Sequence, residues 1–308
     1  MIHMVVTLTG PNDHLRKAAL SERVAAFIAE HDDMAVERLD GEEASAERMR
    51  EALQSLPFLS ARKLVVLREP GKQKAFAEAI ADILEDVAET TDVIIYEPKL
   101  DKRSVYYKTL KKATDFQEFA ALDASGLARW AAAYVAERQG TLSAGDANTL
   151  IARVGSSQQL LQSELDKLLT YDPHITKQTI ALLTERTPDS TIFELLDAAF
   201  SGNTARVFAL YKEQRALKVE PQAIMALMAW QLHILAVVKA AGPRSIDAVA
   251  KEAKLNPFVV RKSQGLVRRL SLVDIRRLVA DLLRLDMQLK RSAVDADEAL
   301  QHYLLTMA

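Results

Sequence analysis

The residues around Gly10 come close in type and spacing to a loop that holds nucleotide phosphates. A short apolar run leads into this glycine, and a helical pattern follows it. Strand, glycine turn and helix is the arrangement in which backbone amides bind phosphate. A working loop needs a second Gly, then Lys, then Ser or Thr, and these positions hold Leu15, Arg16 and Lys17. The pattern indicates either a nucleotide site that has lost its chemistry or an ordinary turn between strand and helix.

A second position also argues against ATP hydrolysis. The apolar run Leu64–Leu67 is followed by Arg68, where an ATPase of this type carries an Asp that holds magnesium. A guanidinium there would repel the metal. The six histidines are scattered without metal-ligand spacing, and the absence of Cys excludes thiolate zinc sites and thiol nucleophiles. We therefore expect no catalytic residue, no metal and no cofactor.

The elements that carry these residues alternate between strand and helix in the first third of the chain. Apolar or alternating runs predict strands at 5–8, 34–39, 64–67, 93–96 and 115–119, and amphipathic patterns predict helices between them, including one from Phe76 to Val87. This order predicts a parallel, doubly wound sheet. The first domain, an α/β unit, is expected to span residues 1–122.

The rest of the chain predicts only helices, so the fold class is α/β plus all-α. Helix stops at Gly140 and Gly155 belong to a small helical domain at 123–187. A third, larger helical domain is expected at 188–308. Its first helix is predicted to begin with a capping box of Thr191 and Glu194, and its last long helix with one of Ser271 and Asp274.

Composition and charge place the chain among soluble globular proteins. Its 308 residues are 49% hydrophobic and 27% charged, and no leader segment or apolar run long enough to span a bilayer is expected. The net charge of −2 is uneven: residues 1–120 hold 17 basic and 22 acidic side chains, and residues 188–308 hold 17 and 13. The basic last third could face nucleic acid or an acidic partner, or be a solvated helical surface. Cytoplasm is the expected location.

The connection Leu56-Pro57-Phe58-Leu59 is unusually apolar for its place between a helix and a buried strand. Pro57 disfavours helix at the preceding residue, so an irregular segment is predicted. Two interpretations remain open from the pattern alone. The side chains of Leu56, Phe58 and Leu59 either fold under the sheet, or project to contact a partner.

The order of features as a whole resembles the delta subunit family of the bacterial DNA polymerase III clamp loader, a branch of the AAA+ proteins without a working ATP site. The stretches that carry the resemblance are Leu8–Gly10, Asp40–Gly41, Ser55–Leu67, Tyr96–Arg103, Ser163–Leu168 and Ile192–Ala198. With no Cys, the chain lacks the Ser-Arg-Cys motif typical of the ATPase and delta-prime subunits. The resemblance implies an AAA+-like domain, a helical lid domain and a helical collar.

The resemblance also implies partners and a docking element. A delta-like subunit binds and opens the sliding clamp (the beta subunit), joins the gamma or tau ATPase subunits and delta-prime through its collar, and surrounds primer–template DNA within the complex. The clamp-binding element of such proteins lies between the second helix and third strand, which assigns clamp contact to Leu56, Phe58 and Leu59. Two alternatives remain: an active P-loop ATPase or kinase, and a helical adaptor unrelated to replication.

Overall fold

The computed structural model describes residues 4–58, 60–291 and 294–307, and the chain divides into two compact units after Ala121. The first unit contains a five-stranded sheet in the order β2-β3-β4-β1-β5, in which every neighbouring pair is parallel. The strands are β1 (Val5–Thr9), β2 (Val36–Asp40), β3 (Lys63–Arg68), β4 (Thr91–Glu97) and β5 (Asp115–Glu118). The predicted parallel α/β fold of this part is confirmed.

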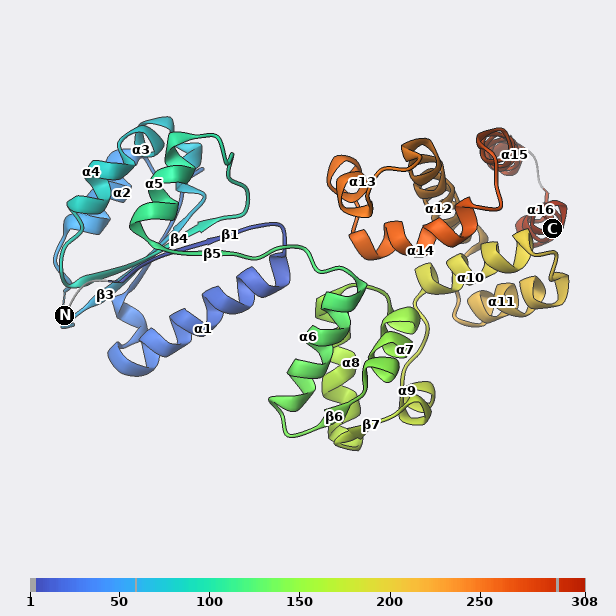
Figure 1. Ribbon diagram of the computed structural model, residues 1–308, viewed down its shortest axis with the longest axis horizontal. Helices are drawn as coiled ribbons and strands as arrows, with labels where there is room; N and C mark the ends of the chain where they lie inside the picture. The colour runs from blue at the N-terminus through green and yellow to red at the C-terminus, as the bar shows by residue number, and fades with distance from the viewer. Residues whose placement is uncertain (1–3, 59, 292–293, 308) are drawn as a thin grey trace. The chain divides into compact units, whose positions relative to one another are not determined.

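Helices cover both faces of the sheet (Figure 1). They are α1 (Asp13–His31), η1 (Asp33–Ala35), α2 (Ala46–Gln54), η2 (Pro70–Lys72), α3 (Lys74–Glu78), α4 (Ile80–Glu85) and α5 (Val105–Ala113). Leu64 and Val66 share a core with α1 on one face, whereas Val65 and Leu67 share a core with α2 to α5 on the other. The alternation of side chains along a strand explains why β3 is apolar throughout.

Two predicted boundaries in this unit are wrong. The helix expected over 76–87 is interrupted at Ala79, where α3 ends and α4 begins. The strand expected from Met34 begins at Val36, because residues 33–35 form the η1 turn.

The second unit starts with a helical group around its own apolar core. The group consists of α6 (Ala124–Ala136), α7 (Ala144–Val154), α8 (Gln158–Tyr171) and α9 (Lys177–Leu183), with two short parallel strands, β6 (Thr141–Leu142) and β7 (His174–Ile175). Leu127, Leu150, Leu161 and Leu165 are among the buried side chains that these helices share. Such a core requires a separate set of inward-facing residues, which the helical spacing of the leucines provides.

A second core in the same unit is built from α10 (Pro188–Phe200), α11 (Thr204–Ala216), α12 (Pro221–Ala241), α13 (Ile246–Ala253), α14 (Pro257–Val267), α15 (Leu272–Arg291) and α16 (Ala296–Thr306). The Ser271–Asp274 capping box is present, with each residue's amide bound by the other's side chain. The Thr191 box is wrong: α10 already begins at Pro188, and the Thr191 hydroxyl donates to the Thr187 carbonyl inside the helix. The division of this unit at residues 187 and 188 stays a prediction.

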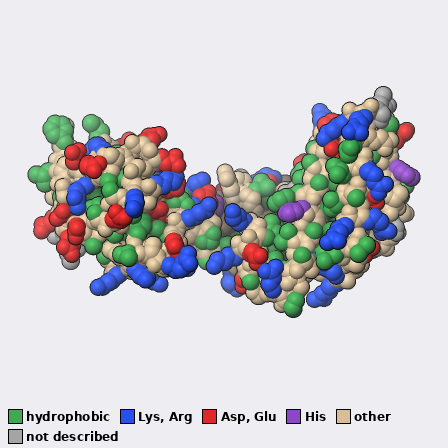
Figure 2. All heavy atoms as spheres, turned by 90° about the horizontal axis from the view of Figure 1, so that it is seen from above, with side chains coloured by type: hydrophobic (Ala, Val, Ile, Leu, Met, Phe, Trp, Pro, Cys, Tyr) green, Lys and Arg blue, Asp and Glu red, His purple; other side chains and the backbone are tan. Residues whose placement is uncertain are grey.

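Helix α12 is the central helix of this second core. Among the described residues it alone is long and apolar enough to cross a membrane by length and composition, which corrects the expectation that no such run exists. In the structure it buries Ile224, Met228, Leu232 and Leu235 against its neighbours, as a core helix does. At the right of Figure 2, Lys and Arg side chains are more frequent than Asp and Glu side chains, with hydrophobic side chains between them, as the charge of residues 188–308 leads one to expect.

Candidate functional site

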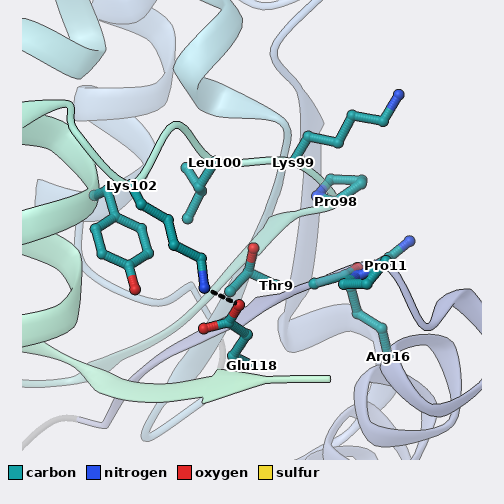
Figure 3. Close-up of a pocket in the computed structure, with 10 residues that line it drawn as sticks. Thr9, Pro11, Arg16, Pro98, Lys99, Leu100, Lys102 and Glu118 are labelled. Atoms are coloured by element: carbon teal, nitrogen blue, oxygen red, sulfur yellow. Dashed lines mark hydrogen bonds and ion pairs between the residues drawn. The ribbon is translucent and has the colours of Figure 1, made fainter. Parts of the chain in front are cut away.

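The sheet reverses its winding direction between β1 and β4. After β1 the chain crosses to β2, and after β4 it crosses over β1 to reach β5. Open parallel sheets bind ligands beyond the carboxyl ends of the strands at such a point. A cavity of about 360 Å³ lies there, lined from the end of β1, the loop after β4 and the end of β5 (Figure 3). The cavity therefore lies at the position where open parallel sheets of this kind bind ligands.

Arg16 places a cation of the protein itself beside the Gly10 turn, where it lines this cavity. Its side chain is buried, its Nη1 donates to the Gly10 carbonyl, and its Nη2 donates to Asp13 Oδ1 at 2.7 Å. The guanidinium carbon lies 4.9 Å from the centre of the Tyr96 ring, within cation–π range. A phosphate loop turns its amides toward an anion. This loop instead offers a carbonyl to a guanidinium, so its polarity is the reverse of what phosphate needs.

The other residues of the predicted loop serve local structure. Gly10 has φ of +110°, and a Cβ added there would lie 2.4 Å from the Phe119 carbonyl oxygen, so glycine is required where the backbone passes this closely. The Leu15 amide donates to the capping side chain of Asn12 at 3.1 Å. Lys17 is exposed and pairs with Asp13 at 2.8 Å, and this hydrogen bond lowers the pKa of the Asp13 carboxyl. Gly10, Leu15 and Lys17, like Arg16, therefore serve contacts within the protein.

Arg68, the second position that argued against hydrolysis, faces the same aromatic ring. Its guanidinium carbon lies 5.9 Å from the centre of Tyr96, across β3 and β4. Two positive side chains thus lie against one aromatic ring, and both would repel a magnesium ion bound beside them. At the cavity rim, Lys102 pairs with Glu118 at 2.6 Å (Figure 3). Across the described residues, no group of three or more His, Asp or Glu side chains is placed to bind a metal.

Glu97 is the carboxylate at the carboxyl end of β4, and it is buried. Its Oε1 accepts hydrogen bonds from the Gly71 amide at 2.7 Å and the Tyr106 hydroxyl at 3.0 Å. Burial raises the pKa of Glu97 to about 7, because the charged form loses its hydration. The first hydrogen bond holds the η2 turn and the second holds α5 against β4, which is a structural use of the group.

The apolar connection after α2 lies at the opposite end of the sheet. Leu56 is 76% exposed and Phe58 is 87% exposed. The interpretation that these two side chains fold under the sheet is therefore wrong. Leu59, the third predicted contact residue, lies outside the described residues. An exposed Phe and Leu side by side leave apolar surface in water, which usually marks an interaction site when several such side chains gather.

Two sets of polar contacts, made by Lys63 and Arg62, hold the ends of this connection. The Lys63 amine donates to the Ala52 carbonyl in the last turn of α2 and to Ser55 Oγ at 2.7 Å. Arg62 makes a two-pronged pair with Asp92, at 2.6 and 3.2 Å, and also donates to the Glu89 carbonyl. Burial lowers the pKa of Lys63, in keeping with its use inside the fold. The projecting side chains therefore stand on a connection that is anchored on both sides.

Comparison with known protein families identifies the family of this chain. Residues 13–120 match the family model for DNA polymerase III, delta subunit, and residues 189–307 match the model for the DNA polymerase III delta subunit, C-terminal domain. The chain belongs to the DNA polymerase III delta subunit family. The first match runs from α1 to β5 of the first unit, and the second takes in the α10–α16 group from its second residue on. This confirms the family expected from the order of motifs.

Relatives of the delta subunit family agree over the full length. DNA polymerase III subunit delta of Bacillus subtilis is 24% identical, with the alignment covering 99% of this chain and 93% of that protein. The solved structure of the Bacillus subtilis DNA clamp loader delta protein superposes with a TM-score of 0.83 at 23% identity, covering 99% of this chain and 95% of the other. The fold is that of a clamp loader delta protein.

Sequence reasoning missed three residues at the apolar connection. Lys63 and Arg62 were not recognised as its anchors, because their partners lie 8 to 30 residues away along the chain. Met34, which the alternating pattern predicts in a strand, stands exposed beside the connection. The two acidic residues Asp32 and Asp33, directly before Met34, are the one sequence signal for a turn at residues 33–35.

Proposed function

We propose that this chain binds the sliding clamp through Leu56 and Phe58 and helps open it for loading on primed DNA, without turning over ATP itself. The observation that carries the proposal is the pair of exposed apolar side chains on an anchored connection. It lies between α2 and β3, where delta-like proteins carry their clamp-binding element. The reversed phosphate loop supports the non-catalytic part, since Arg16 and Arg68 stand where phosphate and magnesium would bind.

The physical basis of docking is the removal of apolar surface from water. Burying a side chain of this size in a partner contributes about 1.5–3 kcal/mol. Because Leu56 and Phe58 are 76% and 87% exposed in the free chain, most of that contribution is still available for binding. The contacts of Lys63 and Arg62 restrict the connection before binding, so less conformational entropy is lost on docking. Aromatic anchors of this kind behave as hot spots.

We further propose that the α10–α16 group joins the gamma or tau ATPase subunits and delta-prime as a collar. A cavity of about 360 Å³ lies between α12 and α15, lined by Met225, Ala229, Val279, Leu282 and Leu283 among others. Of the lining residues, Val279 and Leu283 are exposed at 43% and 57%. This apolar surface fits a helix of a neighbouring subunit. The assembled complex would surround primer–template DNA in the cytoplasm.

Clamp binding by paired alanine variants tests the proposal. Leu56→Ala with Phe58→Ala is expected to weaken the affinity for the sliding clamp by about 100-fold or more, since two anchors contribute about 3 kcal/mol or more together and 1.4 kcal/mol is tenfold. Leu59→Ala is a separate arm that tests the third predicted contact.

Val105→Ala is the matched control, because Val105 is 75% exposed on the same unit but begins α5 at the opposite end of the sheet. It should leave the affinity unchanged. A folded double variant that binds the clamp like the unaltered chain would refute the docking role of the connection. The same measurement made by calorimetry also gives the heat capacity change, which should be negative if apolar burial drives binding.

A further inference from the structure

A hollow beside the apolar connection has a second wall. Its volume is about 340 Å³, and it lies between the Ser55–Phe58 segment and the turn that links α1 to β2. The first wall presents Leu56 and Phe58, and the second presents Met34. Any partner that seats on the first wall therefore faces the second wall across the same hollow.

Met34 is the most exposed large apolar side chain among the described residues, at 89%. Its neighbour Ala35 is 7% exposed and packs in the core beneath α1, so the turn is fixed to the fold while the Met34 side chain projects. A strand at 34–39, which the alternating pattern predicts, would not account for the exposure of the Met34 side chain. A strand beginning at Met34 would have paired its backbone with β3, whereas the pairing starts at Val36.

The backbone before Met34 adopts a conformation that costs free energy. Asp32 has φ of +117°, a region that residues with a side chain rarely adopt. Its amide donates to the Ile28 carbonyl at 3.1 Å and ends α1, and its Oδ1 accepts from the Met34 amide at 2.9 Å. Asp32 thus ends one helix and starts the η1 turn in a single residue. Strained backbone of this kind is concentrated at functional positions.

We propose that Met34 is a second apolar anchor for the sliding clamp, on the far side of the hollow from Leu56 and Phe58. This inference rests on the proposed clamp-binding function and adds a contact from a different segment of the chain. Methionine suits the position because its unbranched, polarizable side chain adapts to an uneven partner surface. The partner is the same clamp because the three side chains border one hollow.

A double-mutant cycle on the full-length chain tests the inference. The affinity and dissociation rate for the sliding clamp are measured for the unaltered chain, Met34→Ala, Phe58→Ala and the two together. Met34→Ala is expected to weaken binding about tenfold, mainly through faster dissociation. Met34→Leu should restore most of the affinity, because it keeps the apolar volume. Val105→Ala is again the matched exposed control.

The outcomes separate this inference from the function on which it rests. Weaker binding by Phe58→Ala with unchanged binding by Met34→Ala would overturn the role of Met34 and leave the clamp-docking proposal standing. Unchanged binding by both variants would overturn both. Another possible occupant of the hollow is a second copy of this chain, and sedimentation of the chain alone tests for it. If Met34→Ala alters self-association and leaves the clamp affinity unchanged, the surface joins two copies of this chain and the inference is wrong.

Discussion

Replacing Arg16 tests whether the protein's own cation stabilises the reversed phosphate loop. Arg16→Ala removes the hydrogen bond to the Gly10 carbonyl, the ion pair with Asp13 and the contact with the Tyr96 ring. Hydrogen bonds from a charged donor contribute about 1.5–3 kcal/mol, and a desolvated cation–π contact contributes about 1–2 kcal/mol. The Nε atom has no hydrogen-bond partner in the described structure, which offsets part of this sum. We expect the first unit to lose about 2–4 kcal/mol of stability.

The assay must report on the first unit alone. Both tryptophans, Trp130 and Trp230, belong to the second unit, so their fluorescence does not follow the sheet. Hydrogen exchange of the β1 and β4 amides is the direct measurement, because it gives local opening free energies. Lys17→Ala is the control, since Lys17 is 62% exposed and pairs with the same Asp13 at the surface. Equal protection of β1 and β4 in Arg16→Ala and the unaltered chain would refute the reasoning.

The purified chain should show neither ATP turnover nor magnesium-dependent nucleotide binding, because Leu15, Arg16 and Arg68 oppose that chemistry, and calorimetric titration with and without magnesium decides this. In the Glu97→Gln variant, the free energy of unfolding should no longer fall as the pH rises. Burial raises the pKa of Glu97 from 4.5 to about 7, so the folded state keeps a proton that the unfolded state releases, and stability falls across this interval by an amount on the order of 3 kcal/mol. Denaturation at pH 5 and pH 8 measures it, and an equal pH dependence in both proteins would contradict the assignment. Leu283→Glu should weaken co-elution with the other loader subunits in size-exclusion chromatography. Leu182→Glu, a control at a 69% exposed position on α9, should leave co-elution unchanged. If both variants co-elute equally, the α12–α15 surface is not part of the interface.

The sheet could be predicted from the sequence because its strands are short apolar runs separated by helices. β3 and β4 are buried on both faces, so their patterns have no competing explanation. The helix expected over 76–87 looked continuous because its apolar spacing persists through the interruption at Ala79, and spacing does not register a backbone change. The alternation of apolar residues at Met34 and Val36 predicts a strand in the same way, because it does not reveal the turn at residues 33–35.

The candidate sites were predictable in position and only partly in chemistry. The sequence alone indicated that Arg16 and Arg68 are wrong for phosphate and magnesium. It could not show that both meet Tyr96, which is 80 residues from Arg16 and 28 from Arg68 along the chain. The exposure of Leu56 and Phe58 also needed the structure, because an apolar connection next to a sheet can equally be buried. Pro57 predicted the irregular backbone, and the direction of the side chains depends on contacts such as Lys63 with Ser55.

The guanidinium of Arg16 at the phosphate loop affects how the exposure of a binding surface could be regulated. A nucleotide-driven domain changes state when its phosphate leaves, and that change can hide or reveal a surface elsewhere. Here the corresponding position is held by Arg16, which is covalently part of the chain and has no product to release. On the proposed non-catalytic function, the first unit has no hydrolysis step of its own that could cover Leu56 and Phe58. Covering these exposed side chains would then require a neighbouring molecule.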